Sequence, residues 1–329
     1  MRVLFIVLLC WTAAAALAAD DRPLVIAHRG ASGYLPEHTL EAYALAVEQG
    51  ADFIEPDVVR TKDGVLIARH ENDLTETTDA AAKFPDRRTT KTIDGMKVEG
   101  WFSEDFTLAE IKTLRAKERV SFRNHGNDGK FQVATLAEIL ALRARLSAAK
   151  GRVIGVYPET KHPAYFRSIN LPLEEPLLAA LKDAGLDKAG APVFLQSFEP
   201  DSLKRLAALT SLPRIQLLVA AGDATTDAGL AAIAAYAQGI GPAKTMIIPV
   251  DAQGRTGTPT DLVARARKAG LLVHPYTFRP EPGFLPVSYE GDPAREYCRF
   301  AGLKINGLFT DTPDLALKAL RESCPISAK

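Results

Sequence analysis

Residues 24–43 read LVIAHRGASGYLPEHTLEAY, and residues 50–79 read GADFIEPDVVRTKDGVLIARHENDLTETTD. The apolar runs Leu24–Ala27 and Val65–Ala68 within them predict short buried strands. The first run is followed by the letters HRG and the second by RH. A buried strand has no structural need for such groups at its end, where ionised side chains are costly unless paired or bound to a metal. The pattern therefore indicates metal-assisted chemistry on an anion.

Outward from this stretch, short apolar runs alternate with helical patterns along the chain. Most runs are rich in Val, Ile and Leu without alternation, as is typical of parallel strands covered on both faces. Eight such runs with helices between them predict a (β/α)8 barrel, with a doubly wound open sheet as the main alternative. The eight predicted strands are Leu24–Ala27, Phe53–Val59, Val153–Tyr157, Val193–Gln196, Ile215–Val219, Met246–Val250, Leu271–Pro275 and Gly307–Thr310.

The segments between these runs predict amphipathic helices, some with recognisable ends. Asp261 and Thr312 stand where N-caps are expected, and Gly270 stands where a helix C-cap is expected. The predicted helices are Thr39–Glu48, Leu136–Ala149, Glu174–Ala184, Asp201–Ala208, Leu230–Tyr236, Leu262–Ala269 and Pro293–Ala301.

Residues 75–133 interrupt the alternation, because they hold no clear βα unit. A long excursion in a compact domain is usually an inserted subdomain or an active-site cover. We therefore expect one barrel domain over residues 19–329 with an insertion at 75–133, after the second strand. The basic cluster of Arg87, Arg88 and Lys91 in this insertion favours a solvated surface over a phosphate site.

The composition excludes some classes of partner. The chain of 329 residues is 47% hydrophobic and 24% charged, which is ordinary for a soluble globular protein. Lys+Arg and Asp+Glu are both 40, so the formal net charge is zero. There is thus no electrostatic case for binding nucleic acid or an anionic membrane surface. Any specificity for an anion must come from a local site.

The N-terminus predicts a signal peptide over residues 1–18. Arg2 precedes an apolar run from Val3 to Ala16, and Ala16-Leu17-Ala18 fits a small-residue cleavage site. We therefore expect a periplasmic or secreted protein without stable membrane insertion, with an uncleaved N-terminal anchor as the alternative. An oxidising compartment permits a disulfide between Cys298 and Cys324, although two separate buried thiols are an equal alternative.

Two carboxylates lie on one predicted strand. Glu55 and Asp57 are two residues apart, so both side chains point to the same face. Close carboxylates repel in a low dielectric unless a cation lies between them, and oxygen ligands suit Ca²⁺ or Mg²⁺ better than Zn²⁺. The alternative is a salt bridge to a buried Arg or Lys. Pro56 between them cannot donate to a sheet, so the strand is expected to end or bulge there.

Other strand ends add the remaining candidates. His28 and His70 titrate near neutral pH and suit acid–base catalysis. Arg29 offers a planar fork that matches phosphate. The predicted strand at 153–157 runs into Pro158-Glu159-Thr160-Lys161, which adds a third carboxylate for an oxygen cage and a cation for a phosphate oxygen.

On these residues the chain resembles the glycerophosphodiester phosphodiesterase family, in particular its larger periplasmic type. The motifs cover nearly all of the mature chain and are specific as an ordered set. They are Ala27-His28-Arg29-Gly30, Leu35-Pro36-Glu37-His38-Thr39, Gly50-Ala51-Asp52 before Glu55 and Asp57, Lys62-Asp63-Gly64 before His70, Thr77-Thr78-Asp79, Glu159-Thr160-Lys161 and Phe309-Thr310-Asp311-Thr312-Pro313.

The resemblance implies a TIM barrel with an insertion after the second strand, and it implies roles for particular residues. These are a divalent cation held by Glu55, Asp57 and Glu159, an acid–base pair of His28 and His70, and a phosphate held by Arg29 and Lys161. The chain departs from the family pattern at two positions. Glu71 stands where many relatives have Asp, and Pro56 stands between the first two carboxylates.

The implied reaction hydrolyses glycerophosphodiesters, such as glycerophosphocholine and glycerophosphoethanolamine, to glycerol 3-phosphate and an alcohol. The head group, the choice of Ca²⁺ or Mg²⁺ and the oligomeric state stay open, as does the nucleophile, which is water or the neighbouring glycerol hydroxyl. Tyr276, Phe278 and Phe309 are candidates to line the glycerol pocket.

Two alternatives keep the same barrel with another activity. A phospholipase-D-like enzyme acting on intact lipids would need an exposed apolar rim, for which Trp101, Phe102 and Phe106 are candidates. An exported binding protein or adhesin would not need two acid–base histidines.

Overall fold

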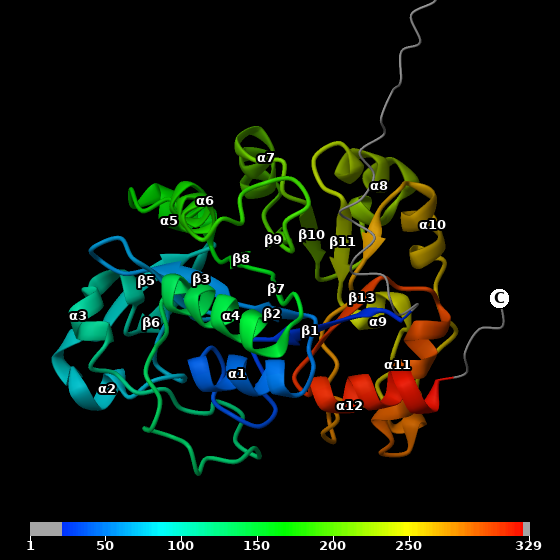
Figure 1. Ribbon diagram of the computed structural model, residues 1–329, viewed down its shortest axis with the longest axis horizontal. Helices are drawn as coiled ribbons and strands as arrows, with labels where there is room; N and C mark the ends of the chain where they lie inside the picture. Colours follow the sequence, from blue (N-terminus) through cyan, green and yellow to red (C-terminus); the bar gives the residue numbers. More distant parts are fainter. Residues whose placement is uncertain (1–21, 325–329) are drawn as a thin grey trace, which may run out of the picture.

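The computed structural model describes residues 22–324, and its first strand, β1 (Leu24–His28), lies between two parallel neighbours (Figure 1). β1 is buried from Val25 onward and pairs with β2 (Phe53–Glu55) on one side and β13 (Gly307–Thr310) on the other. The first and last strands of the fold are therefore neighbours. The predicted signal peptide lies outside the described residues.

Prolines divide two of the strands near their carboxyl ends. Pro56 separates β2 from β3 (Asp57–Arg60), and Pro158 lies between β7 (Gly155–Val156) and β8 (Glu159–Thr160). Proline cannot donate to a sheet, so each strand is interrupted there. The prediction for Pro56 is confirmed. The other barrel strands are β9 (Leu195–Ser197), β10 (Arg214–Leu218), β11 (Gly239–Pro242) and β12 (Leu272–Val273), and β4 (Leu66–Ala68) runs antiparallel to β3.

Backbone hydrogen bonds close the strands into a barrel. The segment that continues β12 is bonded to β11, since the His274 amide donates to the Ile240 carbonyl at 2.9 Å. On its other side, the Asn306 amide donates to the Val273 carbonyl at 2.9 Å and the Phe309 amide to the Pro275 carbonyl at 3.0 Å. This closure confirms the predicted (β/α)8 barrel over the open sheet.

A small apolar cluster fills the inside of the barrel. Ile26, Phe53, Tyr157, Ile215 and Phe309 come from five different strands or their ends and are all buried. Side chains two residues apart on a strand share a face. The residues two positions further along therefore form the next layer, toward the carboxyl ends, where barrel active sites lie.

Helices surround the strands in Figure 1, and all seven predicted helices are confirmed. The Thr39 side chain accepts from the Ala42 amide at the start of α1, and a capping box of Thr135 and Glu138 starts α4. The helices around the barrel are α1 (Leu40–Glu48), α4 (Leu136–Lys150), α5 (Pro163–Ser168), α6 (Glu174–Asp183), α7 (Pro200–Leu209), α8 (Asp227–Ala234), α9 (Lys244–Ile247), α10 (Leu262–Lys268), α11 (Pro293–Gly302) and α12 (Pro313–Lys318).

Three predicted helix ends are found where expected. Asp261 and Thr312 precede α10 and α12, but neither side chain makes a capping hydrogen bond. Gly270 has a positive φ of 78° just after α10, as a glycine at a helix C-terminus commonly does.

One predicted strand, Met246–Val250, is wrong. This apolar run contains the end of α9 and a loop, and the sixth barrel strand is β11 instead. β11 contains Gly239 and Gly241. Glycine has a low strand propensity, so the sequence pattern did not predict a strand here. Close packing favours glycine here, since an added Cβ at Gly239 would lie 2.8 Å from the backbone carbonyl oxygen of Leu272, and one at Gly241 would lie 2.6 Å from Leu217 Cδ2.

The insertion at residues 75–133 contributes no barrel strand, as predicted. It holds a hairpin and short helical turns, on the left of Figure 1. The elements are α2 (Ala80–Lys83), η2 (Pro85–Arg87), β5 (Thr89–Ile93), β6 (Met96–Gly100), η3 (Ser103–Asp105) and α3 (Leu108–Ile111). The remaining short elements of the chain are η4 (Asp223–Thr225), η5 (Val287–Tyr289) and the π-helix η6 (Ala319–Ser323).

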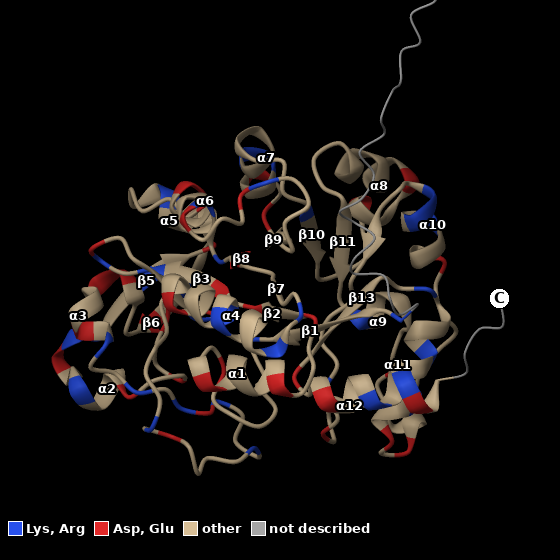
Figure 2. Ribbon diagram, viewed as in Figure 1, with Lys and Arg blue, Asp and Glu red and all other residues tan. Residues whose placement is uncertain are grey.

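The basic cluster in the insertion is paired with acidic neighbours. Arg87 contacts Glu110 at 2.8 Å, and Lys91 contacts Glu104 at 2.8 Å. Figure 2 shows charges of both signs in this region. The cluster therefore fits the predicted charged surface.

The aromatic residues proposed as a lipid-facing rim do not form one. Trp101, Phe102 and Phe106 are 8%, 0% and 0% exposed, because they form the core of the insertion and its contact with the barrel. These residues therefore do not provide the exposed apolar rim that a phospholipase-D-like enzyme would need.

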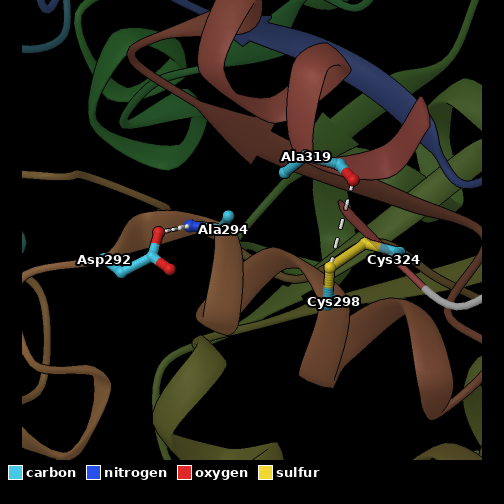
Figure 3. The surroundings of a disulfide bond; sticks show 5 residues. All are labelled: Asp292, Ala294, Cys298, Ala319 and Cys324. Atoms are coloured by element: carbon cyan, nitrogen blue, oxygen red, sulfur yellow. Dashed lines mark hydrogen bonds between the residues drawn. A yellow bond between two sulfur atoms is a disulfide. The ribbon is translucent and has the colours of Figure 1, made fainter. Parts of the chain in front are cut away.

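A disulfide joins Cys298 in α11 to Cys324 just after η6 (Figure 3). This pairing decides between the two alternatives that the sequence left open. Within residues 22–324, no helix has the length and apolar character needed to cross a membrane.

Removal of this disulfide is expected to destabilise the protein without affecting the barrel interior. The two cysteines are 26 positions apart, and a loop of this size corresponds to roughly 3 kcal/mol of unfolding free energy. The double variant Cys298→Ser/Cys324→Ser should show this loss in urea unfolding. The wild-type protein in dithiothreitol should show the same loss, and an unchanged unfolding midpoint in both samples would contradict the prediction.

Candidate active site

The polar residues predicted at strand ends gather in one layer above the apolar cluster. His28 lies two residues after Ile26, Glu55 two residues after Phe53, and Glu159 two residues after Tyr157. Asp311 stands in the same relation to Phe309. The pleat of each strand thus presents an apolar residue to the barrel core and a polar residue to the mouth.

Three buried carboxylates lie together in this layer. Oxygen atoms of Glu55, Asp57 and Glu159 all lie within 4.8 Å of one another, and none of the three residues is more than 6% exposed. Each carboxylate is held by a neighbour. Glu55 accepts from the Arg29 amide at 2.8 Å and from Gln196 Nε2 at 2.9 Å, Asp57 accepts from His38 Nε2 at 2.9 Å, and Lys161 Nζ lies 2.9 Å from Glu159 Oε1.

The carboxylates differ in their tendency to ionise. Burial, then the charges of Asp57 and Glu159, raise the pKa of Glu55 well above its usual value. Burial likewise raises the pKa of Glu159 to about 8, although Lys161 opposes this shift. Burial also disfavours ionised Asp57, but the His38 hydrogen bond and the charges of Lys161 and Arg29 outweigh it and hold that pKa well below its usual value.

This set of oxygen atoms fits a divalent cation. Asp57 Oδ1 is buried and, within the described residues, makes no hydrogen bond. A buried acceptor without a partner is costly, and a cation would satisfy it and remove the repulsion within the cluster. Three carboxylates are hard ligands of the kind that Ca²⁺ and Mg²⁺ prefer.

His28 is oriented by a carboxylate that sequence reasoning did not assign. Its Nδ1 lies 2.7 Å from Asp311 Oδ1, while Asp311 Oδ2 accepts from Arg123 Nη2 at 2.7 Å and Arg279 Nε at 2.8 Å. Burial and the charge of Arg29 lower the pKa of His28 to about 3. The imidazole is therefore neutral near pH 7, with Nδ1–H donating to Asp311 and Nε2 left as a base.

His70 follows β4 and is oriented in a similar way. Its Nδ1 lies 2.8 Å from Glu71 Oε1, and the other oxygen of Glu71 lies 2.6 Å from His162 Nε2. Burial, with the charges of Arg29 and Lys161, lowers the pKa of His70 to about 4. The longer arm of Glu71 is thus held at both oxygen atoms.

Arg29 and Lys161 bring positive charge to the carboxylate cluster from different positions. Arg29 lines the cavity described below, and its Nη1 donates to Glu37 at 2.9 Å. Lys161 is buried beside Glu159, with its Nζ 5.5 Å from the centre of the Phe198 ring, and is not among the side chains that line the cavity.

A cavity of about 410 Å³ opens at this layer, within the usual range for small-molecule sites. Of the predicted residues, His28, Arg29, Glu55, His70 and Glu159 line it, whereas Asp57 does not. The lining also includes cations and apolar side chains, namely Arg119, Lys244, Arg279, Phe198, Leu217, Tyr276 and Phe309. Of the predicted aromatic residues, Tyr276 and Phe309 line the cavity, whereas Phe278 packs against Tyr297 and Phe300 in the core.

Sequence reasoning missed the residues that hold the catalytic candidates. His38 and Asp311 lie within recognised motifs, so their position beside the site was open to inference. Gln196 ends a predicted strand and was a candidate on that ground alone. Arg119 and Arg123 lie in the insertion, where no periodic pattern pointed to them.

Comparisons with known proteins agree with this geometry. A model of the glycerophosphoryl diester phosphodiesterase family matches residues 28–315. Glycerophosphodiester phosphodiesterase GDPD6 of Arabidopsis thaliana is 40% identical over 317 residues, which cover 88% of this chain and 84% of the relative. Glycerophosphodiester phosphodiesterase of Bacillus subtilis is 36% identical over 311 residues, 91% of this chain and 87% of the relative.

A solved structure shares the fold. The Oleispira antarctica phosphodiesterase in complex with its product sn-glycerol-3-phosphate superposes with a TM-score of 0.62 at 20% identity, over 91% of this chain and 96% of that one.

Proposed function

The chain belongs to the glycerophosphoryl diester phosphodiesterase family, and from that membership we propose that it hydrolyses glycerophosphodiesters to sn-glycerol 3-phosphate and an alcohol. The observation that carries the proposal is the meeting of two carboxylate-oriented histidines, three clustered carboxylates and Arg29 at one cavity. This is the equipment that cleavage of a phosphate diester requires. Both the Arabidopsis and the Bacillus relatives carry the name of this activity.

We assign the metal site to Glu55, Asp57 and Glu159, with Ca²⁺ or Mg²⁺ as its ion. A divalent cation bound there would neutralise phosphate charge and lower the pKa of the attacking oxygen, whether that belongs to water or to the neighbouring glycerol hydroxyl. The protein keeps these carboxylates in place through Gln196, His38 and Lys161. His38 is fully buried and its other nitrogen bonds to Tyr43 at 2.7 Å, so Asp57 cannot rotate away without breaking this pair.

We assign acid–base catalysis to His28 and His70. One imidazole accepts the proton of the attacking oxygen at its free Nε2. The other must first bind a second proton, which a nearby anionic phosphate favours, and it then donates that proton to the oxygen of the departing alcohol. The Nδ1 of each ring is bonded to a carboxylate, so each Nε2 is the atom free for proton transfer. Arg29 lines the cavity with its Nε 3.4 Å from Asp57 Oδ2, and together with Lys161 it offsets the negative charge of the phosphate.

The rest of the cavity matches a small substrate. Tyr276, Phe309 and Leu217 line the same cavity and supply apolar surface for the carbon chain of glycerol. The volume of about 410 Å³ suits a deacylated phospholipid better than one with two acyl chains.

We further propose that the protein is exported, as the periplasmic type of the family is. The apolar run after Arg2 supports a cleaved signal, and the Cys298–Cys324 disulfide supports an oxidising compartment. On this view residues 19–329 form one mature domain.

An assay of product release tests the proposal. Purified protein is incubated with glycerophosphocholine after treatment with EDTA, and glycerol 3-phosphate is measured with and without added Ca²⁺ or Mg²⁺. We expect release only when one of these ions is restored. A folded protein that releases nothing with either ion would refute the hydrolase proposal in favour of an exported binding protein.

A further inference from the structure

Two parts of the insertion reach the catalytic end of the barrel. Asp94 lies in the turn between β5 and β6, and Arg123 lies in the segment after α3. Arg123 contacts the carboxylate that holds His28, and Asp94 contacts a residue that holds the carboxylate partner of His70. The insertion is therefore linked to both halves of the proposed acid–base pair.

The first link runs from Arg123 to His28. The Arg123 side chain is only 6% exposed and donates to three groups of the barrel loops. Its Nη2 donates to Asp311 Oδ2 at 2.7 Å, its Nε to Glu281 at 2.6 Å, and its Nη1 to the Ser32 carbonyl at 3.0 Å. Asp311 presents its other oxygen to His28 Nδ1. Arg123 therefore restrains the carboxylate that orients this ring.

An aromatic contact supports this link. Phe122, next to Arg123, packs on the ring of Phe284 with centroids 5.8 Å apart. The guanidinium of Arg279, the second donor to Asp311, lies 4.7 Å from the centre of the same ring. The insertion thus contacts Asp311 directly, and through Phe122 it also contacts the Phe284 ring on which Arg279 lies.

The second link runs from Asp94 to His70. Asp94 Oδ2 lies 2.6 Å from His162 Nδ1, and His162 Nε2 lies 2.6 Å from Glu71 Oε2. Both ring nitrogens of His162 face carboxylates, so both must carry a proton and the ring is a cation. Its positive charge holds Glu71, whose remaining oxygen orients His70 Nδ1.

These contacts are not needed for the fold of the insertion itself. The hairpin is formed by the β5–β6 ladder, and the aromatic core of the insertion is buried without Asp94 or Arg123. Asp94 is about half exposed, in a turn where a side chain without a partner would face water at little cost. The polar groups of both residues instead form hydrogen bonds with residues of the barrel.

We propose that the insertion is a positioning device for the catalytic histidines, with Arg123 acting on His28 through Asp311 and Asp94 acting on His70 through His162 and Glu71. The proposal rests on the function assigned above, and it gives the insertion a role in turnover. Asp94 and Arg123 are positioning residues, since neither is expected to touch the substrate.

The test uses two variants with matched controls. Asp94→Gly, which tolerates the positive φ of 49° at this turn position, and Arg123→Gln break one link each, and both should lower kcat by about tenfold or more with KM and the unfolding midpoint little changed. Asp94→Asn keeps an acceptor for His162 and should recover much of the loss. Glu99→Ala and Arg88→Gln remove the same charges from the same insertion at exposed positions that touch neither link, and they should behave as the wild type does.

A change of leaving group separates positioning from general damage. One histidine protonates the departing alcohol, but 4-nitrophenolate departs without a proton. With the 4-nitrophenyl ester of glycerol 3-phosphate as substrate, the variant that disturbs the acid histidine should regain nearly wild-type turnover. The variant that disturbs the base should not.

Each outcome bears on the proposal. Recovery by one variant alone, with full activity in both controls, supports it and identifies the acid. Wild-type turnover in both variants, equal losses on both substrates, or a parallel loss of stability would overturn it while leaving the hydrolase assignment intact. A wild-type protein inactive on both substrates would overturn the function and this inference together.

Discussion

Alanine in place of His28 or of His70 is expected to lower kcat on glycerophosphocholine by about a thousandfold at pH 7, with a small change in KM. Each variant removes a proton donor or acceptor that acts only as bonds to phosphorus form and break. In the proposed assignment the metal site and Arg29 hold the substrate, and both variants retain these groups. The loss therefore belongs to the chemical step, and steady-state kinetics with saturating Ca²⁺ or Mg²⁺ would measure it.

The chain supplies a matched control for these variants. His125 lies in the insertion, is exposed and pairs with Asp128 at 2.9 Å rather than with any residue of the cavity. His125→Ala should keep wild-type kcat and KM. Activity within threefold of the wild type in His28→Ala or His70→Ala would mean that the histidine concerned is not part of the catalytic pair.

The position of these histidines was predictable because the signal is local. In a parallel barrel the carboxyl ends of all strands meet at one face, so a polar residue just after an apolar run belongs to that face. His28, Glu55 and Glu159 each satisfy this rule within a few residues of sequence. Residues two apart on a strand share a side, which placed Asp57 beside Glu55.

The fold was predictable to the same degree and for the same reason. Seven apolar runs marked strands because packing in the core selects Val, Ile and Leu. β11 was missed, since close packing against the Leu272 backbone and Leu217 favours glycine at positions where a strand former was expected. The apolar run at 246–250 was predicted as a strand because it is rich in apolar residues. Ile247 and Ile248 are indeed buried, but they lie outside the sheet.

The positioning residues were not predictable, because their partners are distant in the sequence. Arg123 and Asp311 are 188 positions apart, and Asp94 and His162 are 68 apart. Neither pair leaves a periodic pattern, and a charged residue in a loop is most often solvated. Only the folded chain brings these charges to the site.

Glutamine in place of Glu55 is expected to abolish turnover and yet to stabilise the metal-free protein above neutral pH. The substitution removes one of three carboxylate ligands, so activity should fall by about a thousandfold or more even with excess Ca²⁺ or Mg²⁺. The shape of the side chain is kept. Gln196 can turn its amide to accept from the new Nε2, since its own Oε1 is buried without a hydrogen bond in the described residues.

The gain in stability follows from the sign of the pKa shifts. Glu55 has a pKa well above its usual value in the folded state, and that of Glu159 rises to about 8. Between about pH 4.5 and pH 8 the unfolded chain releases these protons while the folded metal-free protein retains them. The folded state binds more protons, so its stability falls as the pH rises through this range. Glu55→Gln removes the contribution of Glu55 to this fall in stability, because glutamine does not ionise.

Urea unfolding in EDTA at pH 5 and pH 8 would measure the difference. The wild-type protein should lose stability between these pH values, and Glu55→Gln should lose less, ending at least about 1 kcal/mol more stable than the wild type at pH 8. Saturating Ca²⁺ or Mg²⁺ should reverse the order, because only the wild type gains the full binding energy of the ion. If Glu55→Gln is the less stable protein at pH 8 in EDTA, burial and the neighbouring carboxylates do not disfavour ionised Glu55 in the absence of metal. The case for a cation between them would then lose its physical basis.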